Sequence, residues 1–295
     1  MENKTDYHIH TYYSDGTLSP TEIVKWGKQE KLDQMAITDH DGIDGIPEAM
    51  IAAEALDMIV IPGIEFSVDE PGDITMHMLG YYIDSSNEKL QKKLSDVKAK
   101  RKERNDKLMA ALSDLGYPLD YEDIKKRGGK DYLGKPDFAR ALVEKGYISE
   151  FAEAFESGRF LMSEEIGRIK KEKMSAKEAI ELIAGAGGIP VLAHPMKVFG
   201  LKGDYFEALE NLIVTLKKYG LKGIECVYPE HSEEETRRLI SIAEKHKLHI
   251  TQGTDYHGPK EYPGKRALEE NRGFVYEGKE HQREPKRKKG KSEKK

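Results

Sequence analysis

Short apolar runs rich in β-branched residues alternate along the chain with stretches of helical periodicity, a pattern typical of βα units around a largely parallel sheet. The runs predict seven strands, over residues 7–10, 34–38, 58–62, 77–83, 189–193, 223–227 and 249–253. Helices are predicted from Pro20 onward and over residues 48–56, 175–185, 204–219 and 232–246. Several of these begin at a Ser or Asp that can cap the first turn. Seven strands in this rhythm favour an α/β barrel.

One stretch departs from the alternation. From residue 87 to about residue 173 strand signals nearly vanish, and apolar positions mark a long charged helix that ends at Gly116. We therefore predict a barrel formed by residues 1–86 and 174–280, a helical insertion over residues 87–173 that covers the active site, and a separate tail over residues 281–295.

The composition is that of an ordinary soluble globular protein, with 38% apolar and 34% charged residues among 295. A single cysteine, Cys226, excludes an internal disulfide framework and a Cys-rich zinc site. No apolar run approaches the roughly 20 residues that cross a bilayer, and the polar start lacks an apolar signal core. We predict a cytoplasmic protein with no membrane partner.

The formal net charge of −5 conceals a basic tail, in which residues 281–295 carry eight Lys or Arg against two Glu. Because the tail has no apolar side chain to bury, we expect it to be disordered. One interpretation is a solubilising tail. The other is a segment that binds RNA by releasing counterions, in which case removing it should weaken RNA binding.

Six of the ten histidines fall at the ends of predicted strands, with carboxylates beside them. The candidate donors are His8, His10, Asp15, His40, Glu65, His77, His194, Asp255 and His257. His8 and His10 lie two residues apart and share one face of a strand, as do Asp255 and His257. In parallel α/β barrels the carboxyl ends of the strands meet at one mouth, so these side chains are expected to converge.

Such a cluster would repel itself when charged and be poorly solvated when neutral, unless cations lie among the side chains. Nitrogen and oxygen donors without thiolate suit Mn²⁺, Zn²⁺ or Fe²⁺ and disfavour a pure Mg²⁺ or Ca²⁺ site. At about three to five ligands per ion, nine donors predict two or three divalent ions with one bridging carboxylate.

These motifs resemble the polymerase and histidinol phosphatase (PHP) family of metal-dependent phosphoesterases, over roughly residues 5–276. The resemblance rests on residues 6–11, 14–16, 37–41, 62–65, 192–195 and 253–258. It implies a distorted seven-stranded (β/α) barrel with a trinuclear metal centre, for which Mn²⁺ is the leading metal. The implied ligand sets are His8, His10, Glu65 and Asp255 for the first ion, Asp15, His40 and His257 for the second, and Glu65, His77 and His194 for the third.

Within the family, the chain is similar to a branch with a helical insertion after the fourth strand. That branch includes 3′,5′-nucleoside-bisphosphate phosphatases and 5′-to-3′ ribonucleases that act on short RNA. The similarity rests on residues 134–142, 223–232 and 255–259. Many relatives have Arg and His where this chain has Lys135 and Asp137. Lys135 keeps a positive charge for phosphate but lacks the bidentate fork of Arg, and Asp137 is expected to repel phosphate.

The leading hypothesis is hydrolysis of a phosphomonoester of a nucleoside 3′,5′-bisphosphate or another nucleotide, extending to short 5′-phosphorylated RNA. A hydroxide that bridges two of the ions would attack the phosphorus. Asp15, Glu65 and His257 are the predicted catalytic residues. The candidate substrate contacts are Lys135, Arg140, Arg101, Tyr228 and His231. Tyr228 could stack on a base or could be an aromatic at the barrel rim, and a surface role is the alternative for each of the others.

Two rival functions stay open. One is a small-metabolite phosphatase of histidinol-phosphate type that uses the same centre. The other is a non-catalytic domain whose metals support its structure or a partner interface. We expect the partner to be a phosphorylated small molecule, a nucleotide or a short RNA, and not a DNA duplex, and the sequence leaves the oligomeric state open.

Overall fold

The computed structural model of the chain describes residues 4–125 and 132–259. Within these ranges the strands are β1 (Thr5–Ile9), β2 (Gln34–Ile37), β3 (Ile59–Glu70), β4 (Ile74–Tyr81), β5 (Met174–Ser175), β6 (Ile189–Leu192), β7 (Gly223–Val227) and β8 (His249–Gln252). The longer helices are α1 (Pro20–Gln29), α2 (Ile46–Leu56), α3 (Glu88–Asp114), α5 (Lys135–Glu144), α7 (Ala176–Gly185), α8 (Tyr205–Tyr219) and α9 (Glu233–Lys245). Shorter helical segments are α4 (Tyr121–Lys125), η1 (Phe151–Phe155), η2 (Phe160–Met162), α6 (Glu164–Gly167) and η3 (Pro195–Lys197).

The eight strands of the described residues form one mixed sheet, in the order β1-β2-β3-β4-β6-β7-β8, with β5 pairing to β3. The β1–β2, β2–β3, β6–β7 and β7–β8 pairs are parallel. Strand β4 runs antiparallel to both of its neighbours, β3 and β6. The fold is α/β, as predicted, but the sheet contains an eighth strand and an antiparallel member that the seven-strand prediction did not include.

The direction of β4 follows from the connection that precedes it. Because β3 continues to Glu70 and β4 begins at Ile74, only residues 71–73 join them. A parallel crossover needs about a dozen residues or more, so a hairpin is the connection that fits. Gly72 and Asp73 have φ values of 93° and 61°, the left-handed backbone that tight turns require. The prediction ended the third strand too early because Pro62 and the glycine after it suggest a break.

The two ends of the sheet approach each other where the candidate donors lie. Ile9 and Tyr256 form an isolated parallel bridge beyond β8. The His10 N–H donates to the carbonyl of Tyr256 at 2.8 Å, and the Tyr256 N–H donates to the carbonyl of His8 at 3.1 Å. The chain that follows β8 is therefore held beside the end of β1.

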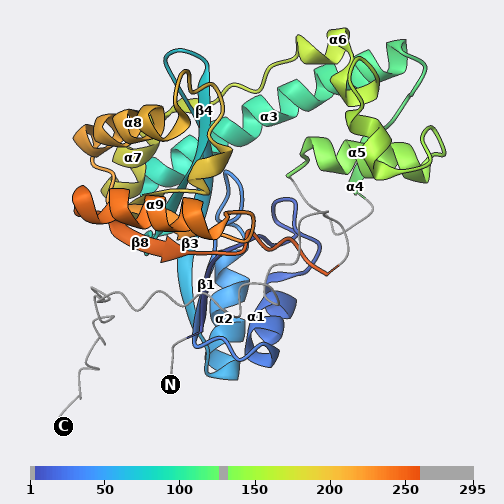
Figure 1. Ribbon diagram of the computed structural model, residues 1–295. Coiled ribbons are helices and arrows are strands. Elements are labelled where there is room, and N and C mark those ends of the chain that lie inside the picture. Colours follow the sequence, from blue (N-terminus) through green and yellow to red (C-terminus); the bar gives the residue numbers. More distant parts are fainter. Residues whose placement is uncertain (1–3, 126–131, 260–295) are drawn as a thin grey trace.

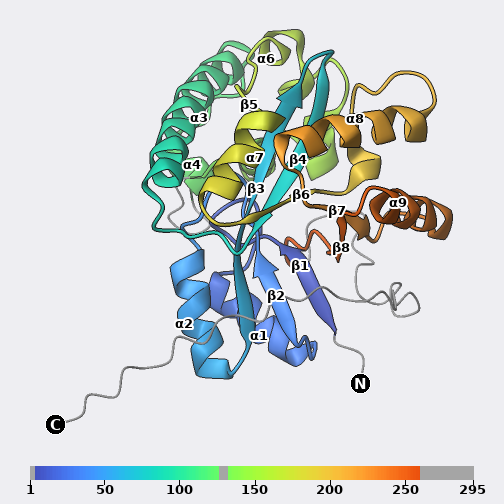
Figure 2. The same ribbon diagram turned by 90° about the vertical axis from the view of Figure 1, so that its left-hand side faces the viewer.

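Helices cover the sheet in two groups, which Figure 1 and Figure 2 show from two directions. Helices α1 and α2 pack against each other beside β1–β3, and α7, α8 and α9 lie along the β4–β8 part. The predicted capping residues Ser175, Asp204 and Ser232 each accept a hydrogen bond from the first turn of α7, α8 and α9. Local capping thus sets where these helices begin.

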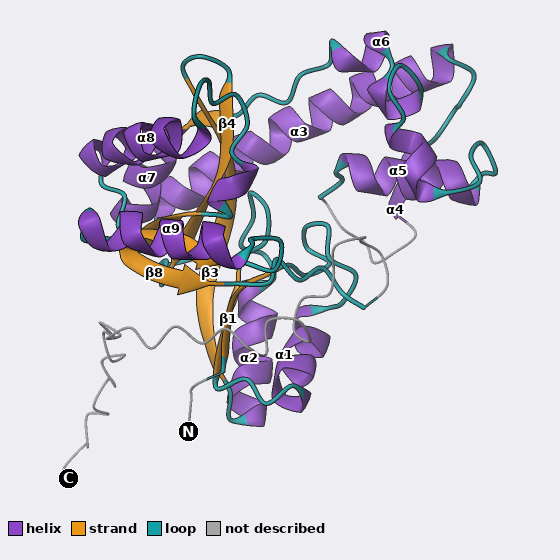
Figure 3. Ribbon diagram, viewed as in Figure 1, coloured by secondary structure: helices purple, strands orange, loops and turns teal. Residues whose placement is uncertain are grey.

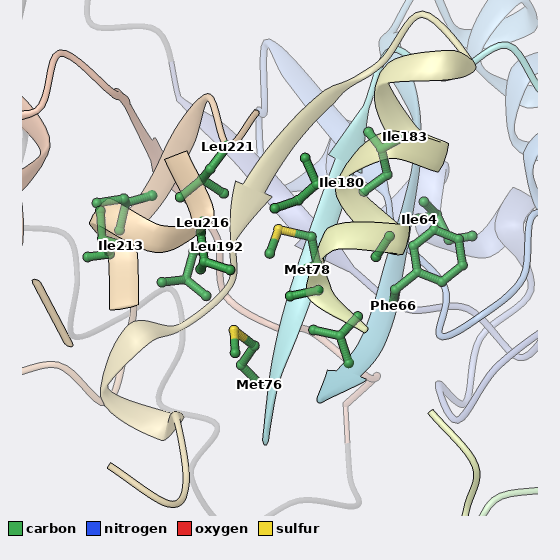
Figure 4. Packing of buried hydrophobic residues seen from close by; sticks show 14 of the residues in the cluster. Ile64, Phe66, Met76, Met78, Ile180, Ile183, Leu192, Ile213, Leu216 and Leu221 are labelled. Carbon is green, nitrogen blue, oxygen red and sulfur yellow. The ribbon is translucent and has the colours of Figure 1, made fainter. Parts of the chain in front are cut away.

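The main hydrophobic core lies between the β3–β8 part of the sheet and the helices packed on it (Figure 4). Ile180 and Ile183 of α7 pack beside Met78 of β4, and Leu216 of α8 packs beside Leu192 of β6. These side chains are fully buried, so they hold the strands that carry the candidate donors in fixed positions.

Helix α3 leads from the sheet to a region of helices and loops formed by α4, α5, η1, η2 and α6 (Figure 3). This region has a hydrophobic cluster of its own, around Leu108, Leu112, Phe138, Leu142 and Ile166. The positions of the cluster match the predicted helical insertion, whose boundaries stay a prediction. The basic tail, residues 281–295, lies outside the described residues.

Across residues 4–125 and 132–259, every helix is too short or too polar to cross a bilayer.

Candidate metal centre

Nine side chains that the sequence singles out meet at one end of the sheet. They lie within or soon after β1, β2, β3, β4, β6 and β8. They are His8, His10, Asp15, His40, Glu65, His77, His194, Asp255 and His257. Most are buried, and the most accessible of them, His77, has a side chain that is 34% exposed. The predicted convergence of these donors at one place is therefore what the fold produces.

Four groups of these side chains bring ligand atoms within 4.8 Å of one another. The groups are His10–Asp15–His40–His257, His8–His10–Asp255, His8–Glu65–His194 and His40–Glu65–His77. All nine predicted donors belong to at least one group. The groups differ in part from the sets that the family resemblance implies, because His194 groups with His8, and His77 with His40. The division of the donors among individual ions stays a prediction.

Glu65 lies at the centre of the cluster, and both of its oxygens face imidazoles. Its Oε1 is 3.2 Å from His8 Nε2, 3.0 Å from His77 Nδ1 and 3.1 Å from His194 Nε2. Its Oε2 is 2.8 Å from His40 Nδ1. A fully buried carboxylate with donors around both oxygens has the arrangement expected of a bridging ligand.

The other two carboxylates flank this centre. Asp15 Oδ1 lies 3.1 Å from His257 Nε2, and its Oδ2 lies 3.7 Å from His40 Nε2. Asp255 Oδ1 lies 3.1 Å from His10 Nε2. Each carboxylate therefore faces an imidazole that comes from a different strand end, which makes the cluster continuous.

Two of the donors have left-handed backbone conformations. His194 has a φ of 24° and Asp255 a φ of 54°. Such conformations cost a non-glycine residue about 1–3 kcal/mol and persist where surrounding contacts hold them. Both residues lie shortly after a strand, so the strain occurs at two of the places where the chain leaves the sheet to enter the cluster.

Glu225 is a buried carboxylate that the sequence analysis did not select. Its Oε1 accepts a hydrogen bond from His8 Nδ1 at 3.0 Å, and its Oε2 accepts one from the His194 backbone N–H at 2.7 Å. It thereby leaves Nε2 of His8 as the atom that faces the cluster. The available signal was a carboxylate inside β7, whose other residues are apolar or small.

Two further buried carboxylates hold the loops that carry the donors. Asp6 accepts hydrogen bonds from the backbone N–H of Thr254 at 3.0 Å and from its hydroxyl. Asp39 accepts hydrogen bonds from the backbone N–H of Thr11 at 2.7 Å and from the Ser14 hydroxyl at 2.6 Å. The segments that carry Asp15 and Asp255 are therefore tied to the sheet by charge-assisted hydrogen bonds.

Burial and mutual charge set the protonation of the cluster. Burial disfavours a charged imidazole, yet Glu225 and Glu65 outweigh it and raise the pKa of His8 well above its ordinary value. Burial and the neighbouring His257 lower the pKa of His10 to about 3. Burial would raise the pKa of Glu65, but the surrounding imidazoles hold it well below the ordinary value. Glu65 is thus anionic and His10 neutral, the forms in which both bind metal.

The donor set fits divalent metal ions. Buried polar atoms are normally hydrogen-bonded, yet several atoms of the cluster lie close to one another without the geometry of a hydrogen bond among the described residues. These atoms are His8 Nε2, His10 Nε2, Asp15 Oδ1, His40 Nδ1 and Glu65 Oε2. Imidazole nitrogens and carboxylate oxygens that lie this close together are the ligands that Mn²⁺, Fe²⁺ and Zn²⁺ share.

The predicted substrate contact Arg101 comes from α3 and reaches the edge of the cluster. Its guanidinium donates to Asp41 Oδ2 at 3.0 Å and lies 4.0 Å from the centre of the Tyr132 ring. Lys171 donates to the same oxygen of Asp41 at 2.7 Å. Asp41 directly follows the donor His40, so this ion-paired group places two cations next to the cluster.

Asp137, near the start of α5, has a partner for each of its carboxylate oxygens. Its Oδ1 accepts a hydrogen bond from Arg140 at 2.8 Å, and its Oδ2 accepts one from the Gly134 N–H at 2.7 Å. The carboxylate is thus compensated by Arg140 and by the start of its own helix, and the repulsion of phosphate by Asp137 stays a prediction. Arg140 also approaches the carbonyl of Asp15 at 3.4 Å, whereas Lys135 donates to the carbonyl of Leu161 at 3.0 Å.

The structure gives Tyr228 a position that differs from the predicted base-stacking one. The residue is only 3% exposed, and its hydroxyl donates to Asp255 Oδ2 at 3.0 Å, so the ring is not available to a base. His231 lies next to it, with ring centres 5.1 Å apart, and its Nδ1 donates to the carbonyl of Cys226 at 3.1 Å. The role of His231 as a substrate contact stays a prediction.

Comparisons with known proteins agree with this geometry. The PHP domain family matches residues 6–225. A 5′-3′ exoribonuclease from Haemophilus influenzae is 32% identical over 259 residues, which cover 88% of this chain and 92% of that protein. A 3′,5′-nucleoside bisphosphate phosphatase from Chromobacterium violaceum is 30% identical, with 87% and 88% covered. The solved structure of a proposed metal-dependent phosphoesterase from Bifidobacterium adolescentis superposes with a TM-score of 0.78 at 30% identity, covering 90% of this chain and 92% of that one.

An α/β sheet with a buried cluster of imidazoles and carboxylates, together with these similarities, defines a metal-dependent phosphoesterase, which is a hydrolase. The chain belongs to the PHP family. The family predicted from the sequence motifs is thus confirmed.

Proposed function

We propose that this protein removes phosphate from nucleotides by hydrolysing a phosphomonoester. Nucleoside 3′,5′-bisphosphates are the proposed main substrates and short 5′-phosphorylated RNA a further one. The observation that carries the proposal is the nine-donor cluster with arginine side chains from the α3–α5 region beside it. The names of the Haemophilus and Chromobacterium relatives support the nucleotide as the substrate class.

When bound, divalent ions would lower the pKa of a coordinated water toward neutrality and neutralise the phosphoryl oxygens. Glu65, with both oxygens turned to the donor cluster, would be the carboxylate that more than one ion shares. Asp15, His40 and His257 would complete one side of the site, and His8, His10 and Asp255 the other. Because Glu225 bonds His8 Nδ1, His8 is held with Nε2 toward the centre.

The cations near the centre would bind and orient the phosphorylated substrate. Arg101 is fixed by Asp41 and by the Tyr132 ring, so little conformational entropy is lost when it binds an anion. Burial lowers the pKa of Lys135, and Arg104, which lies about one turn after Arg101 on α3, lowers it further. An anionic ligand bound near these two half-buried cations would offset their mutual repulsion. We propose that the whole insertion, residues 87–173, covers the mouth of the site in this way.

The test is phosphate release by the metal-loaded protein from adenosine 3′,5′-bisphosphate, a short 5′-phosphorylated RNA and histidinol phosphate, assayed side by side. We expect the bisphosphate to have the highest kcat/KM and the Glu65→Gln variant to be inactive. Preferential turnover of histidinol phosphate would establish the small-metabolite function instead. If no substrate is hydrolysed, yet chelation lowers the unfolding temperature, the non-catalytic interpretation holds.

A matched pair of variants on α3 tests the cationic side of the site. Arg101→Met should raise KM for the bisphosphate about tenfold or more, because hydrogen bonds to charged groups contribute about 1.5–3 kcal/mol. Lys100→Met is the control, since Lys100 is exposed and pairs with Glu172 away from the cluster. Equal effects of the two substitutions would contradict the proposed role of Arg101.

Mn²⁺ as the native metal, a three-ion centre and a cytoplasmic location belong to the same proposal. Elemental analysis of protein purified without chelators measures the first two directly. We expect two to three equivalents of metal per chain, with Mn²⁺ the most abundant.

A further inference from the structure

The two oxygens of Asp255 face in different directions. Oδ1 lies toward the cluster, 3.1 Å from His10 Nε2 and 3.5 Å from His8 Nε2. Oδ2 accepts a hydrogen bond from the Tyr228 hydroxyl at 3.0 Å. The tyrosine therefore occupies one oxygen and leaves the other for the metal centre.

The direction of the protons in this contact is fixed by chemistry. An ionised carboxylate only accepts, so the single hydroxyl proton of Tyr228 points to Asp255. The hydroxyl oxygen is then free to accept, and the Lys197 ammonium donates to it. An ammonium group cannot accept, so the hydrogen bonds run in one order, from Lys197 to Tyr228 to Asp255.

Lys197 is itself held in place by several contacts. Its Nζ lies 3.0 Å from Glu230 Oε1, 4.7 Å from the centre of the Tyr228 ring and 4.0 Å from Asp255 Oδ2. Lys197 is the last residue of η3, three positions after the donor His194. Tyr228 directly follows β7. The segments that follow β6 and β7 thus both reach the Asp255 carboxylate, which itself follows β8.

We propose that Tyr228 and Lys197 are positioning residues that fix the plane of the Asp255 carboxylate and reserve Oδ1 for the metal centre. This inference rests on the metal centre of the proposed function. Without the tyrosine hydroxyl, the carboxylate can rotate or turn both oxygens inward. Metal binding must then provide the free energy that orders the carboxylate. Hydrogen bonds of this kind to metal ligands typically change metal affinity about 10- to 100-fold.

A double-mutant cycle on the full chain tests the hydrogen bonds from Lys197 to Tyr228 to Asp255, with Mn²⁺ as the probe. Protein stripped of metal is titrated with Mn²⁺ in a calorimeter, for the wild type, Tyr228→Phe, Lys197→Met and the double variant. We expect Tyr228→Phe to weaken the tightest Mn²⁺ site about 10- to 100-fold. Lys197→Met should have a smaller effect, and adding it to Tyr228→Phe should change affinity by less than about twofold, because the ammonium donates to the Tyr228 hydroxyl and lies 4.0 Å from Asp255 Oδ2, beyond hydrogen-bond distance.

Tyr205→Phe is the matched control. The Tyr205 hydroxyl lies 2.8 Å from the carbonyl of Pro195 and 3.0 Å from that of Val198, so it holds the same loop without touching a donor. We expect this variant to keep wild-type Mn²⁺ affinity. Lys197→Arg should also keep most of it, because a donor remains.

Three results would overturn the inference. They are wild-type affinity in Tyr228→Phe, effects of the two substitutions that simply add, and a loss in Tyr205→Phe as large as in Tyr228→Phe. Lys197 is partly exposed, so the Lys197→Met comparison stands even if Tyr228→Phe folds poorly. The titration contains no substrate. It can therefore refute the positioning roles of Tyr228 and Lys197 independently of whether the proposed phosphatase activity is found.

Discussion

Replacing Glu225 with Gln should damage the metal centre without touching a predicted ligand. Glu225 is fully buried, and its two oxygens accept hydrogen bonds from His8 Nδ1 at 3.0 Å and from the His194 N–H at 2.7 Å. A glutamine of the same shape has one acceptor and one NH₂ group. Either one of the two donors then faces another donor, or His8 moves its proton to Nε2, the atom that faces the metal centre, and loses a metal-binding lone pair.

The magnitude follows from these two contacts. A hydrogen bond to a charged group contributes about 1.5–3 kcal/mol, and a buried donor left without a partner costs about 1–3 kcal/mol. We therefore expect Glu225→Gln to lower the free energy of unfolding of metal-free protein by about 2–5 kcal/mol. Because His8 also loses its fixed orientation, Mn²⁺ affinity should fall about 10- to 100-fold.

Urea unfolding of the metal-free protein and calorimetric titration with Mn²⁺ measure the two effects separately. Glu210→Gln on α8 is the control, because Glu210 pairs with His246 and Lys245 near the surface. It should leave Mn²⁺ affinity unchanged. If Glu225→Gln unfolds at the wild-type urea concentration and binds Mn²⁺ with wild-type affinity, the assigned role of Glu225 is wrong.

Two further substitutions test the surroundings of the site. Gly253→Ala should lower the free energy of unfolding by about 1–3 kcal/mol and weaken Mn²⁺ binding, because the added Cβ would overlap Glu225 and the Cβ of His8. Gly185→Ala, at the end of α7 where an added Cβ meets no atom of another element within 4 Å among the described residues, is the control; it should leave Mn²⁺ binding unchanged and should not lower the free energy of unfolding, because Ala favours a helix over Gly. Burial would raise the pKa of Asp41, but Lys171 and Arg101 outweigh it and lower that pKa from 3.8 to about 2. Because the folded-state pKa is depressed, the stabilisation by Asp41 is present above about pH 4 and is lost as the pH falls toward 2. Urea midpoints at pH 5 and pH 3 should therefore differ less in Arg101→Met than in the wild type, and an equal difference would refute this account.

The chain's local patterns were sufficient for most of the helices. Helical periodicity and capping residues such as Ser175 and Ser232 depend on contacts within one turn, so they can be recognised without the fold. The antiparallel hairpin between β3 and β4 was not predicted. Its cause is the short span from Glu70 to Ile74, and that span became visible only when β3 proved longer than its apolar run.

The roles of individual polar residues could be assigned only from the tertiary structure. Asp137 is only a negative charge in the sequence, whereas its contacts with Arg140 and Gly134 show a compensated helix-capping residue. Tyr228 reads as an exposed aromatic at a strand end, whereas its hydroxyl is bound to Asp255. In each case the residue type permits several roles, and the partner decides among them.

The kinds and order of the donors were already determined by the sequence, because an imidazole or carboxylate at a strand end keeps its chemistry wherever the strand lies. Which donors face one another was decided by the tertiary structure. His8 and Glu225 are 217 positions apart, and they meet because β1 and the chain beyond β8 are held together at the Ile9–Tyr256 bridge. No local pattern encodes a contact over that separation, since it depends on how the two ends of the sheet are brought together and on the packing that holds them there.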